Sequence, residues 1–466
     1  MHYHFIGIGG IGMGTLASLI LAKGHQVSGS DVAESPMTAS LREKGAQISI
    51  GHRYEQGAGA DYVIFSSAIR PDNPELKAAQ DRNIPILKRA QLLARIMENH
   101  DAITIAGAHG KTTTTSMTSQ LLLKAGLNPT TAVGGIINGI SYNANLGDGR
   151  YFVAEVDESD GSFLYFSPRY SLITNIDYEH VDYYHTWDNI LAAYRQFIQR
   201  THPDGLVIGC GDDARLKDLL SRGERRFITY GFLEGNDVRA ENIQIVKDGP
   251  PFLHFECLCK KEPLGAFCLS VPGQHNILNA MAVIALGVHL KIDVRTIEES
   301  LRIYQGVKRR FQRKGLVHDI LFVDDYGHHP TEITATLRAA HAVKKNRLIT
   351  IFQPHRYTRT KFLMDEFAAS LAESDYLIVT DIYAASETPI EGVTSQVLYE
   401  KILRSGKKDV CYLRKDNIPD HVLRIARPGD MVLTLGAGDI YRVGEQCVEA
   451  LKNRYKDCAP VTGEHG

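Results

Sequence analysis

The chain has 466 residues, of which 44% are hydrophobic, and this is enough for about two to four domains with buried cores. Lys and Arg number 52 against 54 Asp and Glu, so the bulk charge does not indicate binding to nucleic acid or to an anionic membrane. No apolar run of about 18 residues and no basic leader occur, so we expect a soluble cytoplasmic protein without a signal peptide or membrane insertion.

The seven cysteines are scattered along the chain. Cys257 and Cys259 form a C-x-C pair, but no second pair stands at metal-binding spacing. We therefore expect free thiols and no zinc site.

A strand, a glycine turn and a helix are predicted at the start of the first segment, residues 1–98. Strands alternating with helices predict a Rossmann-like domain with a parallel sheet. The turn Gly7–Gly12 satisfies G-x-G-x-x-G, and Asp31 ends the next strand, where an acid often meets a ribose hydroxyl. Alone this pattern suggests NAD, but any diphosphate can use such a turn. We predict a nucleotide or nucleotide-sugar site; the alternative is a turn needed only for tight helix–strand packing.

The most informative pattern opens the second segment, residues 99–309. A predicted strand runs into Gly107–Thr115, GAHGKTTTT, and a helix follows. Backbone N–H groups in such a turn cradle phosphates, Lys111 adds a positive charge, and the Thr112 hydroxyl suits Mg²⁺. The turn is shorter than a standard P-loop, because Ile105 stands where a glycine is expected. We predict a P-loop ATPase-like parallel-sheet domain that binds a nucleoside triphosphate; the alternative is a glycine-rich helix start without a ligand.

Acidic segments follow two further strands of this domain. Glu155–Asp160 and Thr174–Asp182 are both expected at carboxyl ends of strands, where open α/β sheets bind ligands. Clustered acids repel one another unless cations lie among them, so Glu155 is a candidate Mg²⁺ ligand. His180 could bind a metal or position a phosphate, although a lone histidine is often structural.

Two other sets of residues have open interpretations. His275, Asn276 and Asn279 stand at the start of a predicted helix, where they either cap it or contact an adenine edge. Arg310 lies in a basic stretch, residues 305–313, that reads as a hinge. It is either part of a solvated linker or a clamp on a transferred phosphoryl group when domains close.

The third segment, residues 310–466, repeats the α/β pattern and is predicted to be Rossmann-like. Asp324–Pro330 and Pro354–Arg359 each follow a predicted strand. Arg356 and Arg359 are three residues apart, so on a helical turn they would share a face and suit a carboxylate. A structural ion pair is the alternative.

In this order, the motifs resemble those of the Mur ligases of bacterial cell-wall synthesis. The resemblance extends from Gly7 to Gly438. It implies an ATP- and Mg²⁺-dependent amide ligation in peptidoglycan synthesis, in which the carboxylate of UDP-N-acetylmuramate takes the γ-phosphoryl group and the amine of L-alanine attacks the acyl phosphate. The first glycine turn would then hold a UDP-sugar instead of NAD. We expect a monomer or weak homodimer.

Mapped onto this sequence, the resemblance implies a set of residues for each ligand. The UDP-sugar would contact Gly9, Gly10, Ile11, Gly12, Asp31, Ser66, Ser67, Ala68 and Ile69. ATP would contact Gly107, Ala108, His109, Gly110, Lys111, Thr112, Thr113, His275, Asn276, Asn279, Arg310 and Asp325. Mg²⁺ would be held by Thr112, Glu155 and His180. The amino acid would contact Tyr326, His328, Arg356 and Arg359. The implied catalytic residues are Lys111, His180, Arg310 and His328.

The sequence departs from the family pattern at Ala108, where Thr is usual, and at Val156, where Ala is usual. Neither change removes a charged ligand, so we expect at most modest effects on ATP binding. Three alternatives remain. The first is a ligase that attaches a recycled peptide to the same sugar, the second is an NAD-dependent oxidoreductase, and the third is a non-catalytic, nucleotide-regulated binding protein.

Overall fold

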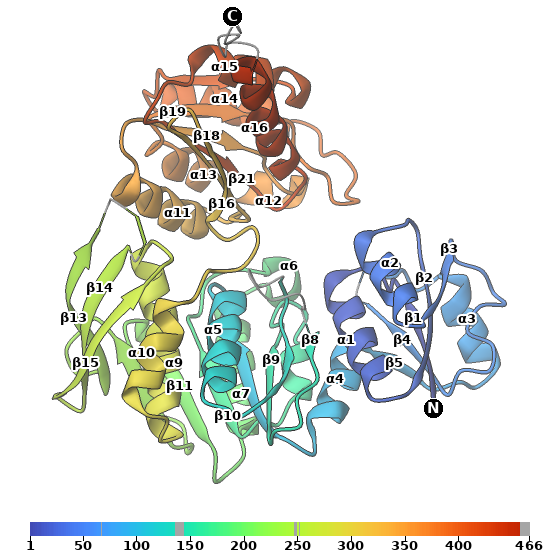
Figure 1. Cartoon of the computed structure of the whole chain (residues 1–466). Helices are drawn as coiled ribbons and strands as arrows, with labels where there is room; N and C mark the ends of the chain where they lie inside the picture. Colours follow the sequence, from blue (N-terminus) through green and yellow to red (C-terminus); the bar gives the residue numbers. More distant parts are fainter. Residues whose placement is uncertain (67, 136–143, 247–248, 251, 457–466) are drawn as a thin grey trace, which may run out of the picture. The chain divides into compact units, whose positions relative to one another are not determined.

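The computed structural model describes residues 1–466 except 67, 136–143, 247–248, 251 and 457–466. The described residues form three sheets (Figure 1). By internal contacts they divide into two compact units. The first is made mainly of residues 1–305, and the second of residues 306–466 with the segments 243–254 and 268–277.

The N-terminal sheet has five strands in the order β3-β2-β1-β4-β5, all parallel. Its strands are β1 (His2–Ile6), β2 (Gln26–Asp31), β3 (Gln47–Ile50), β4 (Tyr62–Phe65) and β5 (Ile86–Lys88). Its helices are α1 (Ile11–Ala22), α2 (Pro36–Glu43), α3 (Pro74–Asp81) and α4 (Arg89–Met97). The strand order reverses its direction across the sheet between β1 and β4. Doubly wound sheets bind ligands at such a position.

The central sheet has ten strands in the order β15-β14-β13-β12-β11-β10-β6-β9-β7-β8. The strands are β6 (Asp101–Ala106), β7 (Thr130–Ala132), β8 (Ala144–Asn145), β9 (Tyr151–Glu155), β10 (Tyr170–Ile173), β11 (Leu206–Cys210), β12 (Phe227–Gly231), β13 (Val238–Ile245), β14 (Leu253–Cys259) and β15 (Glu262–Leu269). The α-helices are α5 (Lys111–Lys124), α6 (Val181–Tyr184), α7 (Trp187–Arg200), α8 (Ala214–Ser221), α9 (Gln274–His289) and α10 (Val294–Arg302). Because β6 lies between β9 and β10 and is parallel to both, the loops that follow these three strands meet at one edge.

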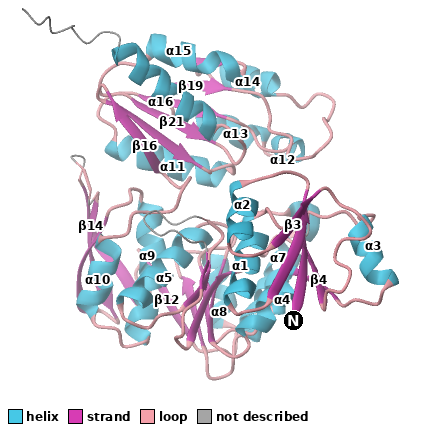
Figure 2. Ribbon diagram, turned by 45° about the vertical axis from the view of Figure 1, so that its right-hand side comes forward, coloured by secondary structure: helices cyan, strands magenta, loops and turns pink. Residues whose placement is uncertain are grey.

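The C-terminal sheet has six strands in the order β16-β17-β21-β18-β19-β20, with helices on both faces (Figure 2). The strands are β16 (Gln312–Val317), β17 (Ile320–Asp325), β18 (Leu348–Phe352), β19 (Tyr376–Val379), β20 (Val410–Tyr412) and β21 (Met431–Leu435). The α-helices are α11 (Pro330–Val343), α12 (Tyr357–Phe362), α13 (Met364–Leu371), α14 (Ser395–Arg404), α15 (Ile418–Ile425) and α16 (Tyr441–Lys456).

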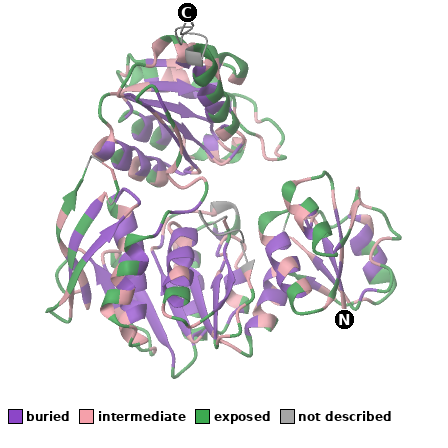
Figure 3. Cartoon of the chain, in the orientation of Figure 1, coloured by how far each residue is buried: buried purple, intermediate pink, exposed green. Residues whose placement is uncertain are grey.

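Side chains alternate across this C-terminal sheet, as a pleated strand requires. Leu348 and Phe352 pack in the core cluster that contains α11, α13 and α14. Ile349 and Ile351 of the same strand pack in the cluster that contains α15 and α16. The strands are therefore buried on both faces, and exposure is concentrated on helices and loops (Figure 3). Burial on both faces explains why these strands are continuous apolar runs in the sequence.

The predicted fold class, α/β with Rossmann-like ends and a central parallel-dominated sheet, is confirmed. The proposed boundaries 1–98, 99–309 and 310–466 remain a prediction. The first predicted strand ends at Ile6, where Gly7 takes a φ of +80° and begins the glycine turn. Short strands such as β3 and β20 were not predicted, since a few residues carry too little periodicity to be recognised.

Among the described residues, no helix combines the length and the apolar character that crossing a membrane requires. The six cysteines that the structure describes are free thiols.

Replacing Leu433 with Ala should lower the free energy of unfolding of the C-terminal sheet by about 2–5 kcal/mol. The side chain is completely buried on β21, between β17 and β18. The measurement is native-state hydrogen exchange at the β21 amides in increasing urea. Leu403→Ala on α14, where the side chain is 39% exposed, is the control and should change this free energy by less than about 0.5 kcal/mol. Equal losses in both variants would contradict the core described here.

Candidate active site

The turn between β6 and α5 needs glycine at two positions. Gly107 and Gly110 have φ values of +131° and +83°, a region that favours glycine. A Cβ on Gly107 would lie 2.1 Å from Thr174 Oγ1, and a Cβ on Gly110 would lie 2.4 Å from Asn279 Oδ1. The close approach of these polar side chains therefore explains why the turn is glycine-rich.

The loop after β10 holds the turn in place. Asn175 accepts hydrogen bonds from Ala108 N through its carbonyl (3.2 Å) and from His109 N through Oδ1 (2.9 Å). Thr174 Oγ1 donates to the His109 carbonyl at 2.6 Å. Two N–H groups of the turn are thus occupied by protein. The first turn of α5, whose N-cap Gly110 makes no side-chain cap bond, presents N–H groups of the kind that can bind an anion.

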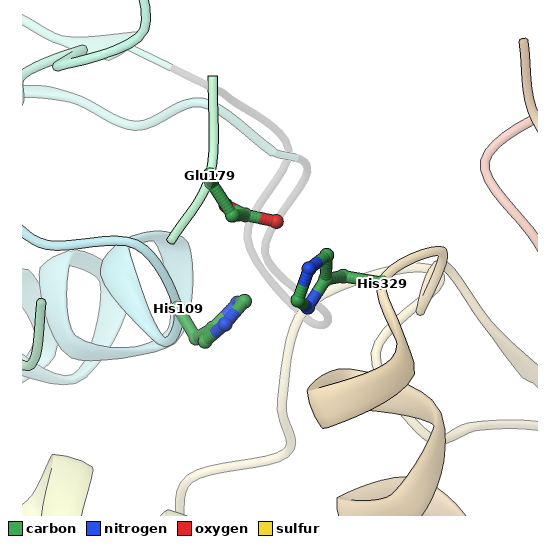
Figure 4. Close-up of side chains that lie close together, drawn as sticks. All are labelled: His109, Glu179 and His329. Atoms are coloured by element: carbon green, nitrogen blue, oxygen red, sulfur yellow. The ribbon is translucent and has the colours of Figure 1, made fainter. Parts of the chain in front are cut away.

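His109, the third residue of the turn, points its ring toward the acidic loop after β10. Its Nε2 lies 2.8 Å from Asp177 Oδ2. Figure 4 shows His109 before α5 and Glu179 on that loop; His329, also labelled there, stands directly before α11.

Lys111 is largely buried, with its side chain 16% exposed, and it is paired in this structure. Its Nζ donates to the carbonyls of Gly107 (2.7 Å) and Ala108 (3.2 Å) and to Glu158 Oε1 (2.8 Å). Burial lowers the pKa of Lys111, but the charges of Glu158, Asp157 and Glu155 outweigh it and raise that pKa above its usual range. Lys111 is therefore a fixed positive charge at the phosphate turn.

The acidic segments supply two groups of oxygen ligands. Thr112 Oγ1 donates to Glu155 Oε1 at 3.0 Å, and Gly134 N donates to Glu155 Oε2 at 3.1 Å. Separately, potential ligand atoms of Glu158, Glu179 and His180 all lie within 4.8 Å of one another. The structure thus places His180 with Glu158 and Glu179, whereas the family resemblance implied Mg²⁺ ligands at Thr112, Glu155 and His180.

These groups suit a hard cation. Glu158 Oε2 is buried and makes no hydrogen bond to any residue that the structure describes. A bound metal ion would supply the missing partner of this oxygen. Burial lowers the pKa of His180, but the hydrogen bond and charge of Glu158 outweigh it and raise that pKa. A cation bound there would take over this role of balancing Glu158.

The three residues predicted to contact adenine, His275, Asn276 and Asn279, have different surroundings. Asn279 Oδ1 accepts a hydrogen bond from Thr114 Oγ1 at 3.2 Å, so Asn279 lies against α5 and the phosphate turn. Asn276 Nδ2 donates to the Pro272 carbonyl at 2.7 Å, in the segment just before α9. Burial, followed by the charge of Arg310, lowers the pKa of His275 to about 4.

In the C-terminal domain, Arg310 lies over the ring of Tyr326, 5.2 Å from its centroid, and 3.4 Å from Glu332 Oε1. Asp325 accepts from Phe311 N and Gly327 N, each at 2.7 Å, while burial raises its pKa to about 6. The predicted Arg310, Asp325 and Tyr326 are therefore neighbours.

His328 and Arg359 lie on either side of His355. The rings of His328 and His355 are 5.8 Å apart, and Arg359 Nη1 lies 3.2 Å from His355 Nδ1. Arg356 precedes α12 with a φ of +70°, so the expectation that Arg356 and Arg359 share one helical turn is wrong. Arg356 is the N-cap of α12, and its N–H donates to the Tyr383 carbonyl at 2.8 Å.

In the N-terminal domain, Asp31 Oδ2 accepts a hydrogen bond from Gly9 N at 2.8 Å. A Cβ on Gly7 would lie 3.3 Å from Ile69 Cδ1, so the loop after β4 approaches the glycine turn. Ala68 N donates to Ser66 Oγ at 3.1 Å. The structure brings these predicted sugar-nucleotide residues together; Ser67 lies outside the described residues.

Sequence reasoning missed several partners, among them Glu158, Asn175, Glu332 and His355. Glu158 and Asn175 lie inside the motifs Glu155–Asp160 and Thr174–Asp182. Nothing in the sequence shows which acid faces Lys111. His355 stands next to Arg356 in Pro354–Arg359, and its position in this strand-end segment was the available signal.

A phosphate turn with acid-lined strand ends, joined to two Rossmann-like sheets, defines a nucleotide-dependent α/β enzyme. The chain belongs to the Mur ligase family. Residues 2–101 match the model of the Mur ligase family catalytic domain, residues 105–287 match the Mur ligase middle domain, and residues 309–438 match the Mur ligase glutamate ligase domain.

Three similar proteins illustrate the relationship. A UDP-N-acetylmuramate–L-alanine ligase of Geotalea uraniireducens is 47% identical over 451 residues, which is 96% of this chain and 98% of that protein. The crystal structure of a UDP-N-acetylmuramate-alanine ligase from Thermotoga maritima has a TM-score of 0.83 at 31% identity, covering 98% and 100% of the two chains. A murein peptide ligase from Psychrobacter arcticus has a TM-score of 0.70 at 26% identity, covering 97% and 99%.

His328 should remain neutral from pH 8 down to pH 5. Burial, only partly offset by the charge of Glu332, lowers its pKa to about 3. The measurement is the ¹⁵N chemical shift of the imidazole nitrogens against pH, with the signal assigned by its absence in His328→Gln. A midpoint above pH 6 for His328 would contradict its burial.

Proposed function

We propose that this chain is an ATP-dependent ligase that joins L-alanine to the carboxylate of UDP-N-acetylmuramate, giving ADP and phosphate, in peptidoglycan synthesis. The observation that carries this proposal is the largely buried, positively charged Lys111 in the turn Gly107–Thr115, which is lined by strand-end acids. The alanine-ligase relatives described above support the choice of substrates.

The reaction needs two bond exchanges. A carboxylate oxygen of the sugar attacks the γ-phosphorus of ATP, and the bond from that phosphorus to the oxygen of ADP breaks. The neutral alanine amine then attacks the carbonyl carbon, the carbon–oxygen bond to phosphate breaks, and the nitrogen gives up one proton and keeps the other as the amide N–H. Both steps build negative charge around phosphate oxygens, so catalysis depends on fixed positive charge and hydrogen-bond donors.

The central domain supplies these groups. In the proposed reaction the N–H groups at the start of α5, in the segment Gly110–Thr113, hold the phosphates, and Lys111 exchanges its bond to Glu158 for a phosphate oxygen. The approach of Asn279 to the turn fits a place near the bound nucleotide. We assign His275 and Asn276 to the adenine side as part of the same proposal.

The oxygen ligands fit Mg²⁺, and we propose that Thr112 and Glu155 hold one ion while His180, with Glu158 and Glu179, holds another. When bound, the cation neutralises developing charge on the phosphoryl oxygens. The hydroxyl and carboxylate of the first pair already lie within hydrogen-bond distance.

The C-terminal domain is proposed to bind the amino acid and complete the phosphate site. Arg356 and Arg359 suit the carboxylate of L-alanine, because a guanidinium binds a carboxylate with two hydrogen bonds. Arg310 is proposed to contact the transferred phosphoryl group, with Asp325 near the nucleotide. A pKa of about 3 makes His328 a poor proton acceptor, so we assign it, with Tyr326, to positioning the amino acid.

The N-terminal glycine turn, Gly9–Gly12, is proposed to bind the diphosphate of the UDP-sugar, with Asp31 and Ser66–Ile69 beside it. We also propose that the chain works in the cytoplasm as a monomer or weak homodimer. The recycling ligase is a candidate because the murein peptide ligase described above shares the fold. It ranks second because its identity to this chain is lower than that of the alanine-ligase relatives.

Phosphate release with UDP-N-acetylmuramate and Mg-ATP should require L-alanine. We expect rapid release with L-alanine and only background release with the tripeptide L-alanyl-γ-D-glutamyl-diaminopimelate. The measurement is a coupled phosphate assay over a panel of amino acids and this peptide. Release with the tripeptide alone would instead identify the recycling ligase, and NADH binding without ATP turnover would support an oxidoreductase.

Lys111→Ala should abolish ligation, with a loss of at least about 10³-fold in kcat, because the fixed charge opposite the phosphates is removed. Binding of UDP-N-acetylmuramate should be nearly unchanged, since its proposed site is on another sheet. The matched control is Lys124→Ala at the other end of α5, where Lys124 pairs with Glu299 at the surface. A Lys111→Ala variant that ligates at the rate of the control would remove Lys111 from the mechanism.

A further inference from the structure

The N-terminal domain contains a buried carboxylate outside the sites described above. Glu75, in the first turn of α3, is 1% exposed. It accepts hydrogen bonds from His4 Nε2 (2.6 Å), Ser30 Oγ (2.7 Å) and His52 Nδ1 (2.6 Å). Burial raises the pKa of Glu75, but these hydrogen bonds outweigh it and lower that pKa below its usual value. Glu75 is therefore ionised and can only accept hydrogen bonds.

An ionised Glu75 fixes the orientation and tautomer of His52. A carboxylate cannot donate, so the Nδ1 atom of His52 must carry the proton. Ser30 Oγ lies 3.0 Å from the same Nδ1, and because its own proton goes to Glu75, it is a second acceptor for His52. In a neutral imidazole the other nitrogen is then an acceptor. His52 thus presents Nε2 on the side of its ring that faces away from Glu75.

His52 stands at the ligand-binding edge of the N-terminal sheet. Ile50 pairs with Asp31, and Gly51 N donates to the Asp31 carbonyl at 2.8 Å, so His52 follows directly where β2 and β3 end. The side chain of Asp31 holds Gly9 of the glycine turn. The His52 side chain is 17% exposed, and no residue within the described part of the chain hydrogen-bonds its Nε2.

We propose that Glu75 positions His52 so that Nε2 accepts a hydrogen bond from the nucleoside part of the uridine-diphosphate ligand. The inference rests on the function proposed above for the N-terminal turn. An acceptor matches a ribose hydroxyl or the ring N–H of uracil. It does not match the diphosphate, whose ionised oxygens offer no donor at neutral pH. His52 is the binding residue in this proposal, and Glu75 acts through it.

The same polar cluster supplies a matched control. Ser28 Oγ lies 2.8 Å from His4 Nδ1 and 2.7 Å from His2 Nε2, so the hydrogen bonds continue from Glu75 to the first residue of β1. His2 belongs to the cluster but stands at the opposite end of the parallel strands from His52. Its replacement disturbs the cluster without touching the proposed ligand contact.

The test is the dissociation constant of UDP-N-acetylmuramate, measured by calorimetry on the full chain. His52→Ala should weaken binding about tenfold, and Glu75→Gln should weaken it about fivefold. The double variant should bind no more weakly than His52→Ala alone, because Glu75 acts through His52. His2→Ala should stay within about twofold of the unmodified chain, and ATP affinity should be unchanged throughout. In kinetics, KM for the UDP-sugar should rise while kcat stays constant.

An unchanged dissociation constant in His52→Ala would overturn the proposal, and this variant decides even if Glu75→Gln fails to fold. An equal loss from Glu75→Gln with and without His52 would overturn the positioning role, since it would show a general effect on the domain. If the unmodified chain does not bind UDP-N-acetylmuramate at all, the proposed function fails. If the unmodified chain and His52→Ala bind UDP-N-acetylmuramate equally well, only the proposed role of His52 fails.

Discussion

The largely buried ammonium group of Lys111 is the constraint on which the rest of the central site depends. A buried charge is costly unless it is paired and hydrogen-bonded, and here two carbonyls of its own turn and Glu158 satisfy it. The pairing is possible because β6 lies between β9 and β10, so a lysine after one strand meets acids after its neighbours. The phosphates of a bound nucleotide can replace Glu158 as the partner, which leaves that carboxylate available to a cation.

A hydrogen bond to a side-chain oxygen holds a strand-end turn in each of the three sheets. Asn175 binds the N–H of His109, Asp31 binds that of Gly9, and Asp325 binds that of Gly327. In each case a side-chain oxygen at the carboxyl edge fixes the turn that follows a strand. Rigid turns keep the remaining N–H groups and charged side chains in place before ligand arrives, which reduces the free energy lost in ordering them on binding.

The sequence predicted the features that depend on local pattern, and it missed those that depend on long-range pairing. Strand–turn–helix order and the glycines made the phosphate turn and the α/β class predictable. The partner of Lys111 was not predictable, because several acids follow β9 and only the three-dimensional structure shows that Glu158 faces the lysine. The Glu75–His4 contact joins residues 71 apart, and Arg356, which has a positive φ, bonds through its N–H to the distant Tyr383.

The central claim is that a carboxylate oxygen of the sugar attacks the γ-phosphorus of ATP. The most direct measurement uses UDP-N-acetylmuramate labelled with ¹⁸O in that carboxylate, with L-alanine, Mg-ATP and the unmodified chain. Mass spectrometry of the released phosphate should find one ¹⁸O atom per phosphate, because the carbon–oxygen bond of the acyl phosphate breaks when the amide forms. Phosphate without the label, released together with amide product, would contradict the account.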